Sequence, residues 1–115
     1  MTDTIFKKII NKEIPAEIVF ESDSVLAFRD INPKAPTHIL IIPKEEIPSV
    51  REINGKEHGP LLGKMIDAAN LIAKNECISD DGFRLVINCG NNAGQEVYHL
   101  HIHLLGGRKM TWPAG

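Results

Sequence analysis

The fold of this chain is decided by residues 98–105, which read Tyr-His-Leu-His-Ile-His-Leu-Leu. Successive side chains of a β-strand point to opposite faces. The histidines at 99, 101 and 103 therefore share one face of a strand predicted over 97–105. The alternate residues, Tyr98, Leu100, Ile102 and Leu104, form an apolar face that can pack against a helix. A solvent-facing strand usually carries Thr, Lys or Glu on its outer face. Here three of the five histidines of the chain share that face, which indicates a functional site.

Imidazoles in this arrangement support two kinds of chemistry. Neutral imidazole is a common metal ligand, and a His-x-His pair with His38 could supply three zinc ligands. Cys77 and Cys89 lack the spacing of metal-binding or redox pairs. Alternatively, one ring nitrogen attacks phosphorus while an acceptor holds the other, and neighbouring histidines bind phosphate or protonate the leaving group.

The ten residues before the histidines favour the metal-free alternative. Residues 88–97 read Asn-Cys-Gly-Asn-Asn-Ala-Gly-Gln-Glu-Val. Gly94 lets the backbone approach an anion closely, and turned N–H groups can surround a phosphate. A zinc site would favour further carboxylates or thiols here. We therefore expect a phosphate-binding loop leading into the histidine strand.

The rest of the chain predicts strands with two helices outside them. Apolar spacing predicts a short helix over 5–10, capped by Thr2 or Asp3 and ended by Ile14-Pro15, and a long amphipathic helix over 60–76. Further strands are predicted over 17–21, 25–30, 37–42 and 83–88. The third of these is apolar after His38, so both its faces should be covered. Because helices and strands do not strictly alternate, the pattern indicates an α+β fold on an antiparallel sheet.

Composition limits the function classes. A chain of 115 residues, 43% hydrophobic, suits a single domain spanning residues 1–115. A net charge of −2 argues against a general nucleic-acid partner. The apolar runs are far shorter than the ~20 residues of a membrane span, and the first residues do not resemble a secretory signal. Two cysteines without a framework are typical of reduced thiols, so we expect a cytoplasmic protein.

Residues 99–105 match the His-φ-His-φ-His-φ-φ signature, with φ apolar, of the histidine triad superfamily. Residues 94–99, 106–108 and Trp112-Pro113 resemble its Hint branch, and the likeness extends from about Ile5 to the last residue. The resemblance implies a five-stranded antiparallel sheet that joins a second sheet across a homodimer. It also implies a cofactor-free phosphoramidase that cleaves the P–N bond of purine nucleoside 5′-phosphoramidates.

The resemblance also implies roles for four histidines. His101 corresponds to the nucleophile that carries a transient nucleotidyl group. His103 corresponds to a residue at the phosphate and the leaving group. His99 corresponds to a residue that supports the nucleophile, with His38 as its expected hydrogen-bond partner.

Nucleotide-binding positions follow from the same resemblance. Asn88, Gly94 and the N–H groups of Glu96 and Val97 fall where phosphate is bound, and Asp30 falls where the ribose is held. The residues around the base would be Ile5, Phe6, Ile9, Phe28 and Ile31. The tail with Trp112 would shape the neighbouring subunit's site. Glu96 departs from the family pattern, because many members have a small hydroxyl residue there; we expect it to face solvent or the leaving group.

Three alternatives stay open at this point. A zinc-dependent hydrolase would lose activity with a chelator. A non-catalytic nucleotide-binding regulatory protein would bind adenosine monophosphate without hydrolysing a phosphoramidate. A dinucleoside polyphosphate hydrolase belongs to a sister branch, from which the Trp-Pro ending points away.

Overall fold

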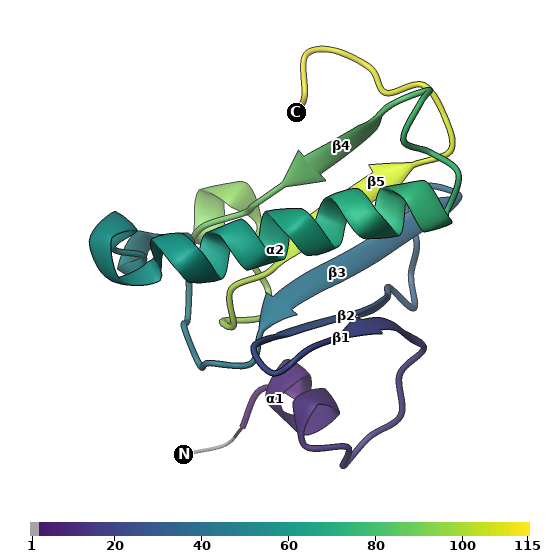
Figure 1. Ribbon diagram of the computed structural model, residues 1–115. Helices are drawn as coiled ribbons and strands as arrows, with labels where there is room; N and C mark the ends of the chain where they lie inside the picture. The colour runs from purple at the N-terminus through teal and green to yellow at the C-terminus, as the bar shows by residue number, and fades with distance from the viewer. Residues whose placement is uncertain (1–2) are drawn as a thin grey trace.

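The computed structural model describes residues 3–115. Its elements are α1 (Ile5–Ile10), β1 (Ile18–Glu21), β2 (Val25–Arg29), β3 (Thr37–Pro43), the 3₁₀ turn η1 (Val50–Glu52), α2 (Gly55–Asn75), β4 (Phe83–Val86), the 3₁₀ turn η2 (Asn91–Ala93) and β5 (Ile102–Gly106). The strands form one sheet in the order β1-β2-β3-β5-β4, and every neighbouring pair is antiparallel. The predicted five-stranded antiparallel α+β fold with two α-helices is therefore confirmed (Figure 1).

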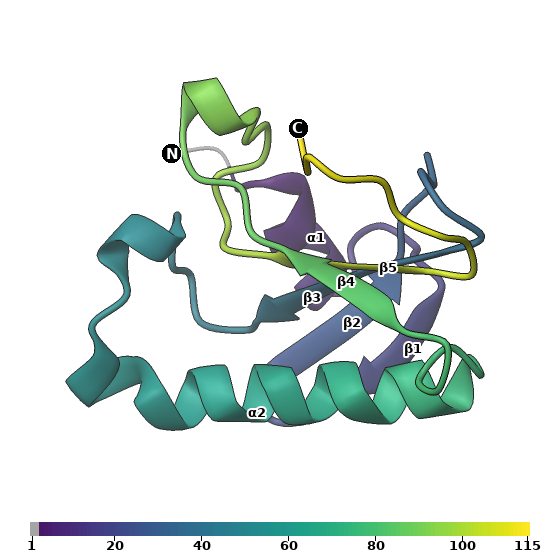
Figure 2. The ribbon, with the colours of Figure 1, turned by 90° about the horizontal axis from the view of Figure 1, so that it is seen from above.

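The two helices lie on opposite faces of the sheet (Figure 2). On the central strand β3, Ile39 and Ile41 belong to the larger core cluster beneath α2, whereas Leu40 and Ile42 belong to the cluster that includes Phe6 of α1. All seven residues of β3 are buried, as the apolar run predicted. This alternation places His38 on the α1 face, because it shares the parity of Leu40.

Helix α2 begins five residues before the predicted start, at Gly55 instead of Pro60. The side chain of Asn54 accepts hydrogen bonds from the N–H groups of Lys56 and Glu57 and so caps the first turn. Pro60 is accommodated inside the helix, where the preceding Gly59 has no Cβ to clash with its ring. Within residues 3–115, no helix is long and apolar enough to cross a membrane.

Helix α1 is capped by a residue that the sequence analysis did not choose. The hydroxyl of Thr4 accepts a hydrogen bond from the N–H of Lys7 at 3.1 Å, so the prediction of Asp3 is wrong, and Thr2 lies outside the described residues. The helix ends at Ile10, before the predicted Ile14-Pro15 stop, with Asn11 as its C-cap.

Strand β5 begins at Ile102, five residues after the predicted start. Residues 97–101 do not pair with a neighbouring strand. The N–H of Leu100, for example, donates to the carbonyl of Ile47, which lies outside the sheet, at 2.6 Å. The prediction that Tyr98 belongs to the buried apolar face is wrong as well, since this residue is 45% exposed. Leu100, Ile102 and Leu104 do pack in the core cluster with α2. Strand β4 ends at Val86, two residues short of the predicted Asn88.

Candidate active site

A cleft of about 450 Å³ lies on the α1 face of the sheet. One part of its lining is apolar and comes from α1 and β2, and the other part carries imidazole, carboxylate and amide groups. The predicted site residues that it brings together are Ile5, Phe6, Ile9, Phe28, Asp30, Ile31, His38, Asn88, Gly94, Glu96, Val97, His101 and His103. These residues lie as far apart in the sequence as Ile5 and His103, and folding brings them to one cleft.

Two predicted residues do not line this cleft. His99 is 2% exposed and lies behind it, where its ring Nε2 donates to the carbonyl of Pro43 at 2.7 Å. Trp112 is 82% exposed, and the guanidinium carbon of Arg84 lies 5.9 Å from the centre of its ring. Trp112 therefore does not contribute to the cleft of its own chain, and its role at the neighbouring subunit's site stays a prediction.

The hydrogen bonds of His101 determine which of its nitrogens can react. Its Nδ1 lies 2.7 Å from the backbone carbonyl of His99, which only accepts hydrogen bonds, so Nδ1 carries the proton. In the neutral ring, Nε2 then holds the lone pair. The main-chain oxygen of His99 thus holds the ring of His101 in place. The ring of Phe6 lies edge-on to His101, with centroids 5.0 Å apart and planes at 88°, and restricts its orientation.

A chain of hydrogen bonds determines the tautomers of His38 and His103 in the same way. The N–H of Lys34 donates to Nδ1 of His38 at 3.0 Å, so the neutral ring of His38 is protonated at Nε2. That Nε2–H faces Nδ1 of His103 at 2.9 Å and donates to it. His103 is therefore protonated at its own Nε2, which leaves a donor beside His101, whose ring centre is 5.0 Å away.

The expected pairing of His38 with His99 is wrong. On β3, His38 lies opposite Leu105 of β5, and its side chain reaches His103 on the same face of the sheet. Lys34, whose backbone N–H fixes the tautomer of His38, was not among the predicted site residues. A main-chain donor of this kind leaves no trace in residue type, so no sequence signal could have identified it.

Burial keeps these imidazoles neutral. Removal from water lowers the pKa of His38, His99 and His101 below the ordinary value of 6.5. For His103, burial together with the neighbouring His101 and His38 lowers the pKa to about 4. The neutral form of all four rings therefore predominates at pH 7, which preserves one lone pair on each ring.

Asp30 lines the cleft and also accepts a hydrogen bond within its own loop. Its Oδ1 accepts the N–H of Asn32 at 2.8 Å, which is the turn role that its position after a strand suggests. Its Oδ2 lies 3.5 Å from Nε2 of His38. One carboxylate thus stabilises the loop and lies beside the histidine pair.

Asp30, His38 and His103 also form a group that could hold a cation, with one potential ligand atom of each lying within 4.8 Å of the others. These are not the residues that the sequence analysis considered, which were a His-x-His pair with His38. A cation here would replace the proton between His38 and His103, because both facing nitrogens would have to offer lone pairs. The zinc alternative therefore competes directly with the hydrogen-bond chain.

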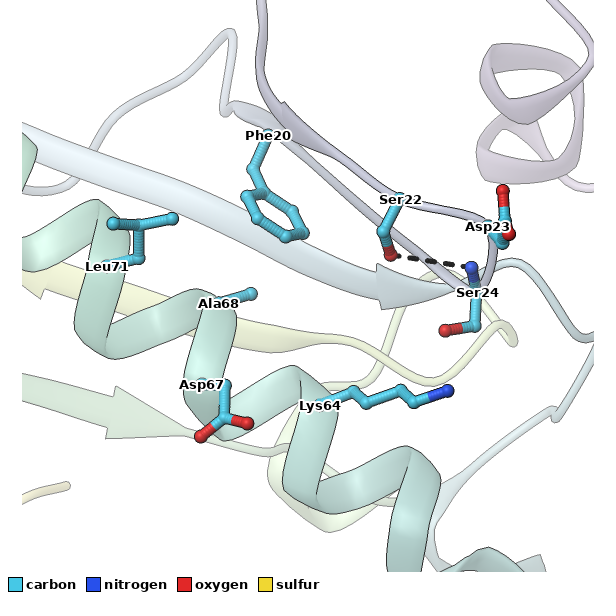
Figure 3. Close-up of a pocket in the computed structure, with 8 residues that line it drawn as sticks. All are labelled: Phe20, Ser22, Asp23, Ser24, Lys64, Asp67, Ala68 and Leu71. Carbon is cyan, nitrogen blue, oxygen red and sulfur yellow. Dashed lines mark hydrogen bonds between the residues drawn. The ribbon is translucent and has the colours of Figure 1, made fainter.

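A second hollow of about 340 Å³ lies on the other face of the sheet, between α2 and the turn joining β1 to β2 (Figure 3). Its lining is Phe20, Ser22, Asp23, Ser24, Lys64, Asp67, Ala68 and Leu71. No histidine or cysteine lines it, and the hydroxyl of Ser22 accepts a hydrogen bond within its own turn. Imidazole chemistry therefore belongs to the histidine cleft and not to this hollow.

Comparison with known proteins places this arrangement in a family. The HIT domain model matches residues 11–110. The chain is 56% identical over 108 residues to the purine nucleoside phosphoramidase of Escherichia coli K12, covering 94% of this chain and 90% of that protein. It is 52% identical over 113 residues to adenylylsulfatase HINT1 of Arabidopsis thaliana, covering 97% and 76%. A crystal structure of a HIT family hydrolase from Legionella pneumophila superimposes with a TM-score of 0.95 at 50% identity, covering 98% and 100%.

The matched residues 11–110 include all five strands and the three histidines at 99, 101 and 103. The chain belongs to the HIT superfamily and, within it, to the Hint branch. The family expectation drawn from residues 99–105 is confirmed.

Proposed function

We propose that this protein is a purine nucleoside phosphoramidase, which hydrolyses the P–N bond of nucleoside 5′-phosphoramidates through a nucleotidyl-histidine intermediate. The observation that carries the proposal is the hydrogen bond from Nδ1 of His101 to the carbonyl of His99, which leaves Nε2 as a nucleophile. The 56% identity to the E. coli purine nucleoside phosphoramidase supports the substrate class. An apolar wall for a base and a polar end for a phosphate suit a nucleotide.

In the first step, Nε2 of His101 attacks the α-phosphorus and the bond from phosphorus to the amine nitrogen breaks. The amine takes the bonding electron pair and needs a proton to leave. A water molecule supplies that proton and leaves a hydroxide, while Nε2–H of His103, the donor next to His101, hydrogen-bonds to the departing nitrogen; Nε2–H of His38 keeps Nδ1 of His103 as an acceptor. The N–H groups of Glu96 and Val97 and the side chain of Asn88 would stabilise the phosphate oxygens.

In the second step, water attacks the phosphorus of the nucleotidyl-histidine and gives a proton to the hydroxide left by the first step, and the P–N bond to His101 breaks. The electron pair returns to Nε2, and the nucleoside monophosphate leaves. The carbonyl of His99 holds Nδ1–H throughout, so the same tautomer is regenerated for the next turnover.

The test is incubation with adenosine 5′-phosphoramidate, followed by mass spectrometry for a nucleotidyl adduct on His101. His101→Asn should abolish the adduct and most turnover but keep affinity for adenosine monophosphate, because the phosphate-binding loop remains. Full turnover by this variant would refute the nucleophile. A parallel sample with chelator separates the zinc alternative: loss of activity that added zinc restores would point to Asp30, His38 and His103 as ligands. Binding without hydrolysis would favour a regulatory protein.

We further propose that the protein forms a homodimer through the free edge of β4. This strand lies at the end of the sheet, and Leu85 and Ile87 beside that edge are 36% and 40% exposed. An apolar edge strand is a template for pairing with a second chain. Sedimentation equilibrium should give a dimer for the wild type and a monomer for Leu85→Lys/Ile87→Lys; a monomeric wild type would contradict the proposal.

We propose the cytoplasm as its location. Cys77 and Cys89 are both free thiols, and Cys77 is exposed, which suits a reducing compartment. Cell fractionation with an antibody tests this.

A further inference from the structure

The stretch between η2 and β5 carries Glu96, Val97, His99 and His101, yet it lies outside the sheet ladder. Something other than strand pairing must therefore hold its backbone. The partner that holds it is the last residue of β3 together with the segment that follows this strand. Nε2 of His99 donates to the carbonyl of Pro43 at 2.7 Å, and the N–H of Leu100 donates to the carbonyl of Ile47 at 2.6 Å.

Gln95 supplies the third connection between these two segments. Its side chain is buried, with the residue 6% exposed, and every polar atom of its amide has a main-chain partner. Nε2 donates to the carbonyls of Pro48 at 2.9 Å and Val97 at 3.1 Å. Oε1 accepts the N–H of Gly90 at 3.1 Å. A glutamine placed between two carbonyls and one N–H fits in one orientation of its amide only.

The same amide closes the loop on itself. Gly90 and Val97 are the two ends of the segment that contains Gly94 and Glu96, and Gln95 binds both ends. Its own N–H also donates to the carbonyl of Gly90 at 3.1 Å. Gly90 and Gly94 both have φ of +80°, a conformation that residues with a Cβ rarely adopt, so two glycines give the loop its path and Gln95 joins its ends.

We infer that Gln95 is the positioning residue of the phosphate site: its buried amide aims the N–H groups of Glu96 and Val97 into the cleft without itself touching the ligand. Gln95 does not line the cleft, whereas Gly94, Glu96 and Val97 on either side of it do. The inference rests on the proposed function, since it takes the ligand anion to be the α-phosphate of a nucleotide.

Replacement of Gln95 by the similarly shaped Met leaves two carbonyls and one N–H without their partner. Replacement by Glu places a carboxylate oxygen where Nε2 meets the carbonyls of Pro48 and Val97, which repels both. In either variant the loop N–H groups should lose their alignment, whereas the apolar wall of the cleft, built on α1 and β2, stays in place.

The experiment compares the affinities of adenosine monophosphate and adenosine by isothermal titration calorimetry for wild type, Gln95→Met and Gln95→Glu. We expect monophosphate affinity to fall about tenfold or more and adenosine affinity to change less than twofold, because only the phosphate needs the loop. If Gln95→Met or Gln95→Glu fails to fold, Gln95→Ala is measured in its place, because the smaller side chain leaves room for water to bridge the carbonyls. A parallel loss for both ligands, or no loss for either, overturns the inference.

Ser49→Ala is the matched control. Ser49 is 3% exposed and lies next to Pro48, but its hydroxyl serves η1, where it accepts the N–H of Arg51 and donates to Glu52. This variant should lower thermal stability without changing the ratio of monophosphate to adenosine affinity. A wild type that neither hydrolyses adenosine 5′-phosphoramidate nor prefers the monophosphate over adenosine refutes the proposed function instead. A wild type that does both, with unchanged ratios in the Gln95 variants, refutes only the role of Gln95.

Discussion

Acidification should destabilise this protein through His103, and the size of the effect follows from its surroundings. Burial and the neighbouring His101 and His38 lower its pKa from 6.5 to about 4. Between these two values the unfolded chain binds a proton at this histidine and the folded chain does not. Stability therefore rises with pH across this window: the contribution of His103 is complete above about pH 6.5 and is lost as the pH falls toward 4.

The magnitude comes from the free-energy equivalent of a pKa change. At 1.36 kcal/mol for each tenfold change in proton affinity, the His103 shift corresponds to about 3 kcal/mol between pH 7 and pH 4. Because His38 and His101 share part of this effect, we expect a measured difference of about 2 kcal/mol. That is a substantial fraction of the ~5–15 kcal/mol by which domains are stable.

The assay is urea unfolding of wild type and His103→Asn at pH steps from 7.5 to 4.5. Asn can still accept the hydrogen bond from His38 but does not titrate, so acidification should cost the wild type about 2 kcal/mol more than the variant. Carboxylates that titrate in the same range are common to both proteins and cancel in the comparison. NMR titration of the histidine ring signals gives the pKa of His103 directly. Parallel stability curves, or a His103 pKa near 6.5, would refute this account of the buried triad.

Three further outcomes follow from the site. His38→Asn should lower kcat about 10- to 100-fold with little change in KM, because His103 loses the donor that fixes its tautomer; an unchanged kcat would contradict the hydrogen-bond chain. Gly94→Ala should destabilise the protein by about 1 kcal/mol in thermal unfolding, since a Cβ there meets no atom within 4 Å and the cost lies only in φ of +80°. Glu96→Ser should change adenosine monophosphate affinity less than threefold by calorimetry, because the side chain is exposed; a large gain would show that the carboxylate faces the phosphate.

The spacing of apolar residues predicted helices and strands correctly where residues close together in the sequence determine the structure. The alternation along β3 and the apolar spacing within α2 correspond to observed elements, because period-two and helical patterns reflect which face is buried. The errors lie at element ends. Residues 97–101 alternate like a strand but leave the ladder. The N–H of Leu100 instead donates to the carbonyl of Ile47, a partner that no local pattern reveals.

The sequence by itself determined the family: the spacing of three histidines and the apolar residues between them predicts which face packs against α2 and which face carries imidazoles. Only the tertiary structure decided how these imidazoles are arranged. Whether His38 serves His99 or His103, which nitrogen of His101 keeps its lone pair, and what fixes the loop around Gln95 all depend on main-chain carbonyl and N–H groups. Every residue but proline carries the same main-chain groups, so their placement is a property of the folded chain and cannot be derived from residue identity.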